Sequence, residues 1–342
     1  MMIKYTSFLL VVMMMSCQGQ IATLGNQNQV SIEDQALFEM ASTYLFSLPA
    51  SAKDENHPLS DELVQLGKEL YNEKAISLDK TVSCNTCHSL TNYGVDNLAL
   101  SKGVGGKLGS RNSPSTYNAA LHLAQNWDGR AIDVEDQVEG PLLNPVEMAM
   151  PSKDAIVDRL VNMQKYTTLF AQAYPSETSI TYPKVAQALG AFVRTLLTPS
   201  RLDDYLNGDL TVLSGQEKSG LKKMLDFGCI PCHSGNAMGG ALYQKFGLFD
   251  DYQRFTGSEK HDSGKKSISH LPSDQDVFKV PSLRNVTKTA PYFHDGSVEK
   301  IEDAVQVMAN LQLGRTLSEQ EISDIVAFLA VSADWTSRMG EE

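Results

Sequence analysis

The sequence predicts an all-α protein built from two similar domains. Apolar residues recur at helical spacing behind capping residues, and convincing strand alternation is absent. Each of two Cys-x-x-Cys-His motifs follows such an amphipathic segment. The length of 342 residues gives room for two ordinary domains, each with its own core.

The first 17 residues are predicted to be an export signal rather than part of the fold. Lys4 precedes an apolar run from Phe8 to Met15, which is too short to span a bilayer as a helix. Ser16-Cys17 then resembles the lipobox of bacterial lipoproteins, in which Cys17 becomes the lipidated first residue. Simple cleavage near Cys17 is the alternative. We therefore expect a periplasmic protein with a lipid anchor to a bacterial membrane at Cys17.

Two domains of similar layout are expected after the signal. We assign a flexible linker to residues 18–35, an N-terminal domain to 36–200 and a C-terminal domain to 201–342. The boundary lies near residue 200 because Pro199 ends a predicted helix there. The final helix is left free to pack on either domain.

Capping residues and prolines locate the main helices. The expected helices follow Ser60, cover about 153–173 and about 183–197, and follow the capping boxes Ser214-Gly-Gln-Glu217 and Ser318-Glu-Gln-Glu321. Long Gly-rich connections remain over 91–118 and 234–295. Connections of that length in a compact protein usually wrap a cofactor or carry function.

The cysteines predict covalent attachment of haem. Four of the five occur in Cys84-Asn-Thr-Cys87-His88 and Cys229-Ile-Pro-Cys232-His233. In such a motif, two thiols on one helical turn form thioethers to the haem vinyl groups, and the following imidazole becomes the proximal iron ligand. A redox dithiol would not need the histidine, and a zinc site built from all four cysteines would leave both histidines unexplained. We therefore expect two c-type haems with His88 and His233 as axial ligands.

Composition limits the partners. Lys and Arg number 29 against 41 Asp and Glu, and the resulting net charge of −12 argues against nucleic acid as a partner. With 42% hydrophobic and 20% charged residues, the chain is typical of globular proteins and not of disordered ones. A basic or neutral protein partner remains open.

The two haem motifs belong to a longer pattern. It also contains Arg111-Asn-Ser-Pro114, Trp127-Asp-Gly-Arg-Ala131, Gln137, Val146-Glu-Met148, Ala290-Pro-Tyr-Phe-His-Asp-Gly296 and Met308. Over roughly residues 36–335 this pattern resembles the bacterial di-haem cytochrome c peroxidases. The resemblance implies two cytochrome c-like domains and a periplasmic enzyme that reduces hydrogen peroxide to water. It also implies a small cytochrome c or a cupredoxin as electron donor, and a homodimer.

The resemblance assigns catalytic and ligand roles to single residues. In that family the N-terminal haem binds peroxide and the C-terminal haem receives electrons. Glu147 matches the residue that moves a proton between the peroxide oxygens, and Gln137 matches the residue that orients the peroxide. Met308 matches the sixth ligand of the second haem, opposite His233. The simpler alternatives are a solvated surface position for Glu147 and a core position on a helix face for Met308.

Two further roles also come only from the resemblance. Trp127 matches an aromatic residue between the haems and would be an electron relay. The Asn112 side chain and the backbone carbonyls of Thr289 and Pro291 match a calcium site at the domain interface. Oxygen-only ligands suit calcium. Core packing of Trp127 and turn capping by Asn112 are the alternatives.

The chain departs from the family at one place. Most members carry a histidine shortly before the Arg-Asn-Ser-Pro motif, which ligates the peroxide haem in the resting oxidised enzyme. Val104 occupies that place here, and valine cannot bind iron. We therefore expect a peroxide haem that is open or water-bound at rest and needs no reductive activation. Lys102 or Lys107 could replace the ligand if deprotonated.

Two other function classes stay open because of Val104. The chain could be a di-haem oxidase of a protein side chain or another organic substrate. It could also be a non-catalytic electron-transfer or redox-sensing protein. Neither class explains the joint presence of Gln137 and Glu147 as well as a peroxidase does, and Met308 favours the peroxidase branch because the related protein oxidases have tyrosine there.

Overall fold

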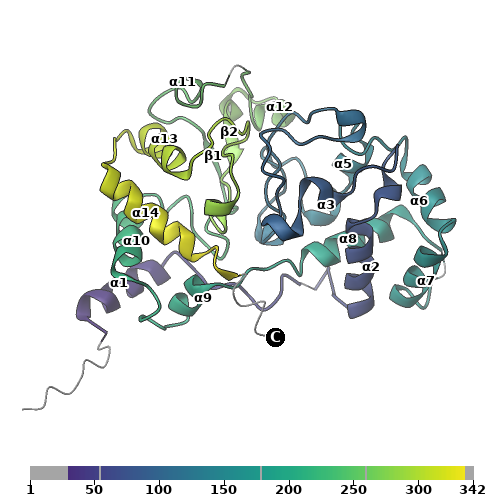
Figure 1. The fold of residues 1–342 in the computed structure, drawn as a ribbon, viewed down its shortest axis with the longest axis horizontal. Helices are drawn as coiled ribbons and strands as arrows, with labels where there is room; N and C mark the ends of the chain where they lie inside the picture. The colour runs from purple at the N-terminus through teal and green to yellow at the C-terminus, as the bar shows by residue number, and fades with distance from the viewer. Residues whose placement is uncertain (1–29, 54, 178, 259, 336–342) are drawn as a thin grey trace, which may run out of the picture.

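The structure, a computed structural model, describes residues 30–53, 55–177, 179–258 and 260–335. The described helices and strands are α1 (Ile32–Ser42), α2 (Asp61–Tyr71), α3 (Cys84–Cys87), α4 (Val134–Gln137), α5 (Glu139–Leu143), α6 (Lys153–Val161), α7 (Gln164–Ala173), α8 (Tyr182–Val193), α9 (Arg201–Leu206), α10 (Gly215–Phe227), β1 (Tyr243–Lys245), α11 (Gln253–Thr256), α12 (Lys266–Ser269), β2 (Val277–Lys279), α13 (Ile301–Leu313) and α14 (Glu319–Val331). They form two mainly helical lobes side by side (Figure 1). The expected export signal and Cys17 lie outside the described residues.

The first lobe is organised around the packing of α2 on α8, with α6 and α7 beside them (Figure 1). Ser60 caps α2 as predicted, because its Oγ accepts a hydrogen bond from the amide of Leu63 (3.2 Å). Leu66 of α2 and Val185 of α8 are completely buried in the shared core. The core of this lobe draws its buried residues from 63–196.

The second lobe repeats this layout with α10 packed on α14 and α13 beside α14. Both predicted capping boxes are present: Ser214 with Glu217 begins α10, and Ser318 with Glu321 begins α14. Leu221 of α10 is completely buried in the core of this lobe. The final helix therefore packs on the second lobe.

A glycine marks the closest approach of the helix pair in each lobe. A Cβ added to Gly67 of α2 would lie 1.9 Å from the carbonyl oxygen of Ala188 in α8. A Cβ added to Gly220 of α10 would lie 1.9 Å from the carbonyl oxygen of Asp324 in α14. Backbone atoms cannot yield as a side chain can, so both helix pairs need a residue without a side chain at the crossing.

Replacing Gly220 by Ala is therefore expected to lower the free energy of unfolding of the second lobe by about 1–3 kcal/mol, because the helices must separate. Chemical denaturation followed by circular dichroism measures this loss. Gly215→Ala in the same helix is the control, because no atom lies within 4 Å of its added Cβ. Equal stability of the two variants would contradict the close packing at Gly220.

The N-terminal helix differs from the prediction of a linker over 18–35 and a first domain from residue 36. α1 begins at Ile32 and packs on α9 and α10 of the second lobe. Ala41 and Leu45 are almost completely buried in the second core. The amide of Gly235 also donates to the carbonyl of Tyr44 (2.8 Å), so this segment covers the chain just after the second haem motif.

Two predicted helices also differ in extent. The helix expected over 153–173 is divided into α6 and α7, because Met163 has extended backbone dihedrals and the Asn162 side-chain amide donates to the Asp158 carbonyl (2.6 Å) at the break. The helix expected over 183–197 ends at Val193, before Pro199.

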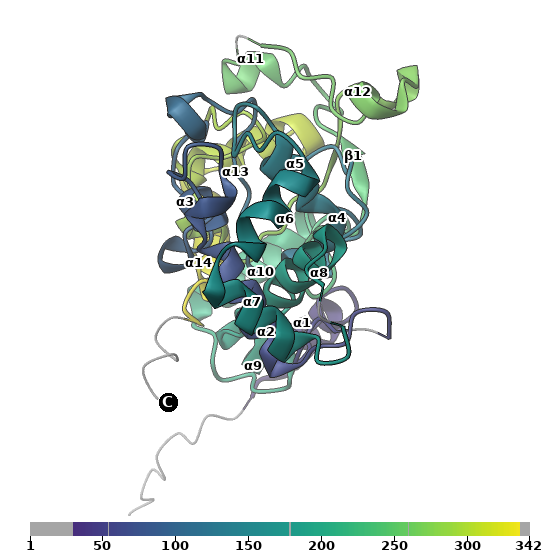
Figure 2. The ribbon, with the colours of Figure 1, turned by 90° about the vertical axis from the view of Figure 1, so that its right-hand side faces the viewer.

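The expected loop 234–295 contains a small antiparallel sheet. β1 pairs with β2, with Tyr243 opposite Lys279. In the side view, α11 and α12 from the same connection lie beyond β1 at the upper edge of the molecule (Figure 2). This sheet could not be predicted, because two strands of three residues are too short for alternation to be visible in the sequence.

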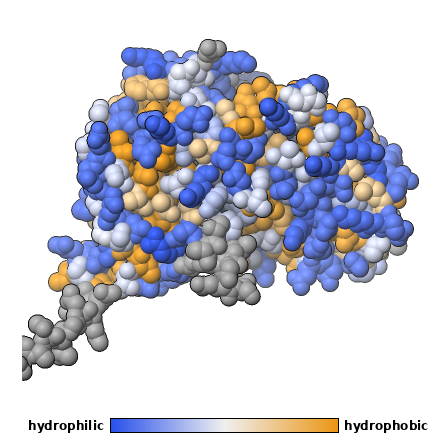
Figure 3. All heavy atoms as spheres, in the orientation of Figure 1, coloured by the Kyte–Doolittle hydropathy of each residue, from blue (hydrophilic) through white to orange (hydrophobic). Residues whose placement is uncertain are grey.

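The surface is mixed in character. On the face of Figure 1, hydrophilic residues dominate, and hydrophobic residues gather over α13 and α14 (Figure 3). Within the described residues, none of the helices is both long enough and apolar enough to cross a membrane.

Candidate active site

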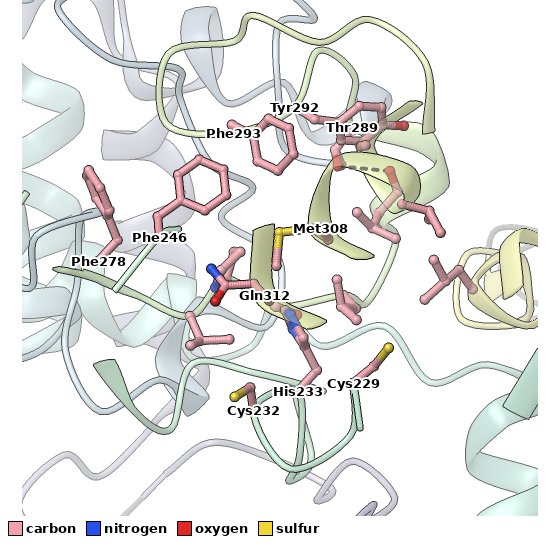
Figure 4. Close-up of a pocket in the computed structure, with 18 of the residues that line it drawn as sticks. Cys229, Cys232, His233, Phe246, Phe278, Thr289, Tyr292, Phe293, Met308 and Gln312 are labelled. Atoms are coloured by element: carbon pink, nitrogen blue, oxygen red, sulfur yellow. Dashed lines mark hydrogen bonds between the residues drawn. The ribbon is translucent and has the colours of Figure 1, made fainter. Parts of the chain in front are cut away.

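The second haem motif lies at a cavity of about 460 Å³ that is lined mainly by apolar side chains of both lobes. Cys229, Cys232 and His233 line one side of it. Met308 of α13 projects into the same space from the opposite side in the close-up (Figure 4). The structure thus brings together the four residues that the sequence assigns to one haem.

The chemistry of the second motif fits a covalently attached haem. Burial raises the pKa of the Cys229 thiol to about 11 and lowers the pKa of His233 to about 4. Hydrogen bonds with the backbone of Pro281 and Met238 oppose the lowering of the His233 pKa but do not offset it. A buried neutral imidazole is the form that binds iron. These features, together with the apolar cavity, agree with a large apolar prosthetic group at this position.

The first haem motif has the same local design. α3 is a single turn of helix, fixed at its start by a hydrogen bond from the Ser83 amide to Thr86 Oγ1 (2.9 Å). The Tyr71 hydroxyl of α2 donates to the carbonyl of His88 (2.7 Å), so the motif is held against the core. Burial raises the pKa of Cys84 to about 12 and lowers the pKa of His88, although hydrogen bonds with the backbone of Pro114 and Gly94 oppose the second shift. Both motifs therefore fit c-type haem.

Glu147 lies close to the first motif. The side-chain amide of Asn144 donates to Glu147 Oε1 (2.6 Å). Burial raises the pKa of Glu147, while the Asn144 hydrogen bond and the charge of Arg130 oppose this rise. The pKa of Cys87 is raised to about 11, mainly by burial and then by the charges of Asp96 and Glu147. Glu147 is thus a half-buried carboxylate whose charge raises the pKa of a thiol in the haem-attachment motif.

The loop that contains Val104 packs directly on the Glu147 turn. The amide of Val104 donates to the carbonyl of Glu147 (2.7 Å), and the Val104 side chain is buried in the first core. A Cβ added to Gly103 would lie 2.2 Å from the carbonyl oxygen of Val146, so no side chain fits between the loop and this turn. Val104 therefore contributes packing at the place where the family usually has a histidine.

The two lysines of this loop point to no replacement ligand. Lys102 and Lys107 are both exposed, and Nζ of Lys107 donates to the carbonyl of Pro145 (3.2 Å) at the surface.

Gln137 has no described hydrogen bond that links its side chain to Glu147. It is the last residue of α4 and is half-buried. Among the described hydrogen bonds, none joins the side chains of Gln137 and Glu147. Its predicted role remains a prediction.

Trp127 and the expected calcium ligands gather at the cavity of the second haem motif. Trp127, Asn112, Thr289 and Pro291 all line it. The indole Nε1 of Trp127 donates to the carbonyl of Asn112 (2.8 Å). The side-chain amide nitrogen of Asn112 donates to the carbonyl of Leu98 (2.9 Å), which leaves its oxygen for another partner.

Two contacts at these sites were not predicted from the sequence. Asn144 stands just before Pro145-Val-Glu147, and its position three residues from Glu147 was the available signal. The second contact joins His122 and Lys279 at the edge of the same cavity, with 3.1 Å between Lys279 Nζ and His122 Nδ1. A separation of 157 residues gives no local signal for such a pair.

Comparison with known proteins identifies the family. The family described as di-haem cytochrome c peroxidase matches residues 61–211. The cytochrome c551 peroxidase of Pseudomonas aeruginosa is 38% identical over 297 residues, which cover 86% of this chain and 85% of that protein. This chain belongs to the di-haem cytochrome c peroxidase family. The predicted family and the predicted enzyme class, cytochrome c peroxidase, are therefore confirmed, and the family supports two c-type haems.

Other relatives show how far the family extends. The methylamine utilization protein MauG of Methylorubrum extorquens is 32% identical over 295 residues, which cover 80% of this chain and 78% of that protein. The crystal structure of a MauG-like protein associated with microbial copper homeostasis has a TM-score of 0.74 and 27% identity, covering 83% of this chain and 93% of that one. The mainly α-helical fold of this di-haem peroxidase family member is thus shared with a solved structure.

Proposed function

We propose that this chain reduces hydrogen peroxide at its first haem motif, with Glu147 as the acid-base residue, using electrons that enter at the second motif. One observation carries the proposal. Asn144 holds the half-buried Glu147 carboxylate close enough to Cys87 for its charge to raise the pKa of that thiol. The neighbouring loop presents the buried side chain of Val104, which cannot bind iron. Proton transfer to a leaving peroxide oxygen would require such a carboxylate beside the place where peroxide binds.

The residues of this chain would hold two haems with different roles. Cys84, Cys87 and His88 would hold the first haem, whereas Cys229, Cys232, His233 and Met308 would hold the second. When bound, the haems supply the iron that binds peroxide and the route for two electrons. Glu147 Oε accepts a proton from one peroxide oxygen and delivers it to the other, which leaves as water, while Gln137 orients the substrate. One hydrogen peroxide, two electrons and two protons give two waters.

The contact between Asn144 and Glu147 predicts a pH effect. The Asn144 amide donates to Glu147 Oε1, which favours the charged carboxylate and keeps its pKa lower than burial alone would. Proton acceptance needs that carboxylate, so activity falls as the pH drops through its pKa. We expect Asn144→Ala to raise the pKa and to move the acidic limb of the kcat/KM profile to higher pH. An unchanged acidic limb would show that this limb does not report Glu147.

The second haem and Trp127 form the electron route in this proposal. If His233 and the Met308 thioether both hold the second haem, they would raise its reduction potential, which suits a site that accepts electrons from a donor. Trp127 would relay them toward the first haem. Calcium held by Asn112 Oδ1 and the carbonyls of Thr289 and Pro291 would fix this interface, since oxygen ligands suit that ion.

Location and partners complete the proposal. The signal pattern in residues 1–17 supports export to the periplasm, and Ser16-Cys17 supports a lipid anchor. A net charge of −12 favours a small cytochrome c or cupredoxin donor with a basic patch. The homodimer is proposed from the resemblance alone.

Steady-state turnover tests the function. The protein with two haems per chain is mixed with hydrogen peroxide and a reduced small cytochrome c, and oxidation of the cytochrome is followed by absorbance. Two cytochromes are expected to be oxidised for each peroxide consumed. Absence of peroxide-dependent oxidation with every basic cytochrome and cupredoxin tried would count against the proposal, and a protein substrate oxidised instead would support the oxidase class.

A further inference from the structure

A buried cation without a counter-ion among the described residues lies at the edge of the cavity at the second haem motif. The Lys279 side chain is only 7% exposed, and it lines the cavity with Cys229, Cys232 and His233. Among the described residues, no carboxylate lies within ion-pair distance of Lys279 Nζ, which instead contacts His122 Nδ1 at 3.1 Å. Burial of an ammonium group costs free energy unless an anion compensates it.

The histidine partner cannot supply that compensation. An ammonium group only donates hydrogen bonds, so Nδ1 of His122 accepts here and the imidazole proton resides on Nε2. Burial and the charge of Lys279 both lower the pKa of His122, which keeps the ring neutral. Nε2 is buried without a partner. The pair therefore presents donors at the cavity edge and lacks an acceptor with negative charge.

The backbone fixes where this charge lies. The amide of Lys279 in β2 donates to the carbonyl of Trp127 (2.8 Å), and Val280 beside it donates to the carbonyl of Leu242 (2.9 Å). His122 comes from the first lobe and packs against Gly240, where an added Cβ would lie 2.3 Å from the ring. The Lys279 backbone and the His122 ring are thus both fixed in place, and the ammonium group contacts that ring from a residue that is only 7% exposed.

We infer that Lys279 is the counter-ion of a propionate carboxylate of the haem attached at Cys229 and Cys232, with His122 fixing its position. A haem carries two such carboxylates, and they are the anionic groups that a cavity with this haem-attachment motif would receive. Because His122 and Lys279 come from different lobes, the propionate contact also joins the lobes beside Trp127. The inference rests on the proposed attachment of a haem at the second motif.

The test is Lys279→Met in the protein loaded with two haems, with two readouts other than activity. The first is the equilibrium constant for reduction of the methionine-ligated haem, measured by spectropotentiometry. Loss of a buried positive charge beside the haem is expected to lower this equilibrium constant about tenfold. A tenfold change corresponds to about 59 mV in the reduction potential of a one-electron couple. The second is the propionate bending band in the resonance Raman spectrum, which is expected to shift.

Two control variants separate a direct propionate contact from a distant effect of charge. Lys245→Met removes an exposed lysine from the paired strand β1 and is expected to change neither readout. Lys279→Arg keeps the charge and is expected to restore both. A propionate band of unchanged frequency in Lys279→Met overturns the inference, even if the potential falls, because a distant charge needs no contact. Fewer than two haems per chain in the unaltered protein would instead refute the proposed attachment, and the two failures are distinguishable.

Discussion

Replacing Glu147 by Gln is expected to lower kcat/KM for hydrogen peroxide by about 10²–10⁴-fold, the usual contribution of a positioned acid-base group. The amide keeps the shape of the side chain and can still contact Asn144, but it cannot accept a proton from peroxide. The measurement is the second-order rate of peroxide reduction with a fixed reduced donor. Haem content and the reduction potential of the second haem are expected to stay unchanged, because only the proton transfer is lost.

The control for this substitution is Glu139→Gln. Glu139 lies on α5 close in sequence, and its carboxylate forms an exposed ion pair with Lys153 (2.7 Å). An exposed ion pair contributes little to stability. The activity of Glu139→Gln is therefore expected to stay within about twofold of that of the unaltered protein. A Glu147→Gln enzyme that keeps more than a tenth of the activity would refute the assigned role, and the proton would then have to come from another group.

Much of the fold could be predicted because its signals are local. Ser60, the Ser214 and Ser318 capping boxes and the apolar spacing behind them determine where α2, α10 and α14 begin. The break between α6 and α7 could not be predicted in the same way, because apolar residues continue at helical spacing across Asn162. The attachment of α1 to the second lobe depends on contacts with α9 and α10, which lie far away in the sequence.

The candidate site also contains some residues that have a local sequence signal and others that have none. The two haem motifs are complete within five residues each, so spacing alone indicates their chemistry. Glu147 has no such local signature, and what distinguishes it from a surface acid is its burial and the hydrogen bond from Asn144. The pairing of His122 with Lys279 is invisible in the sequence because the two lobes must first pack together. Three-dimensional contacts therefore add residues that motif recognition leaves out.

The second large effect is expected at Val104. One equivalent of peroxide added to the fully oxidised protein is expected to change the spectrum of a high-spin haem at once, before any reductant is supplied. Val104 has no group that binds iron, and its amide holds the loop on the carbonyl of Glu147. Val104→His is expected to introduce an iron ligand, convert the resting haem to a low-spin state, and slow this reaction by at least about 100-fold, comparable to the loss of an acid-base group.

The reaction of the oxidised protein with peroxide shows whether the peroxide haem is open or is closed by another ligand. Val104→Ala is the matched control, because it shortens the side chain without adding a ligand, and it is expected to keep the fast reaction. The loop also contacts the first lobe through the Gly105 amide, which donates to Asp79 Oδ2 (3.3 Å), and through Lys107. If the unaltered oxidised protein is inert to peroxide until its second haem is reduced, another group closes the site. Lys102→Met and Lys107→Met would then identify a lysine ligand by restoring the high-spin spectrum.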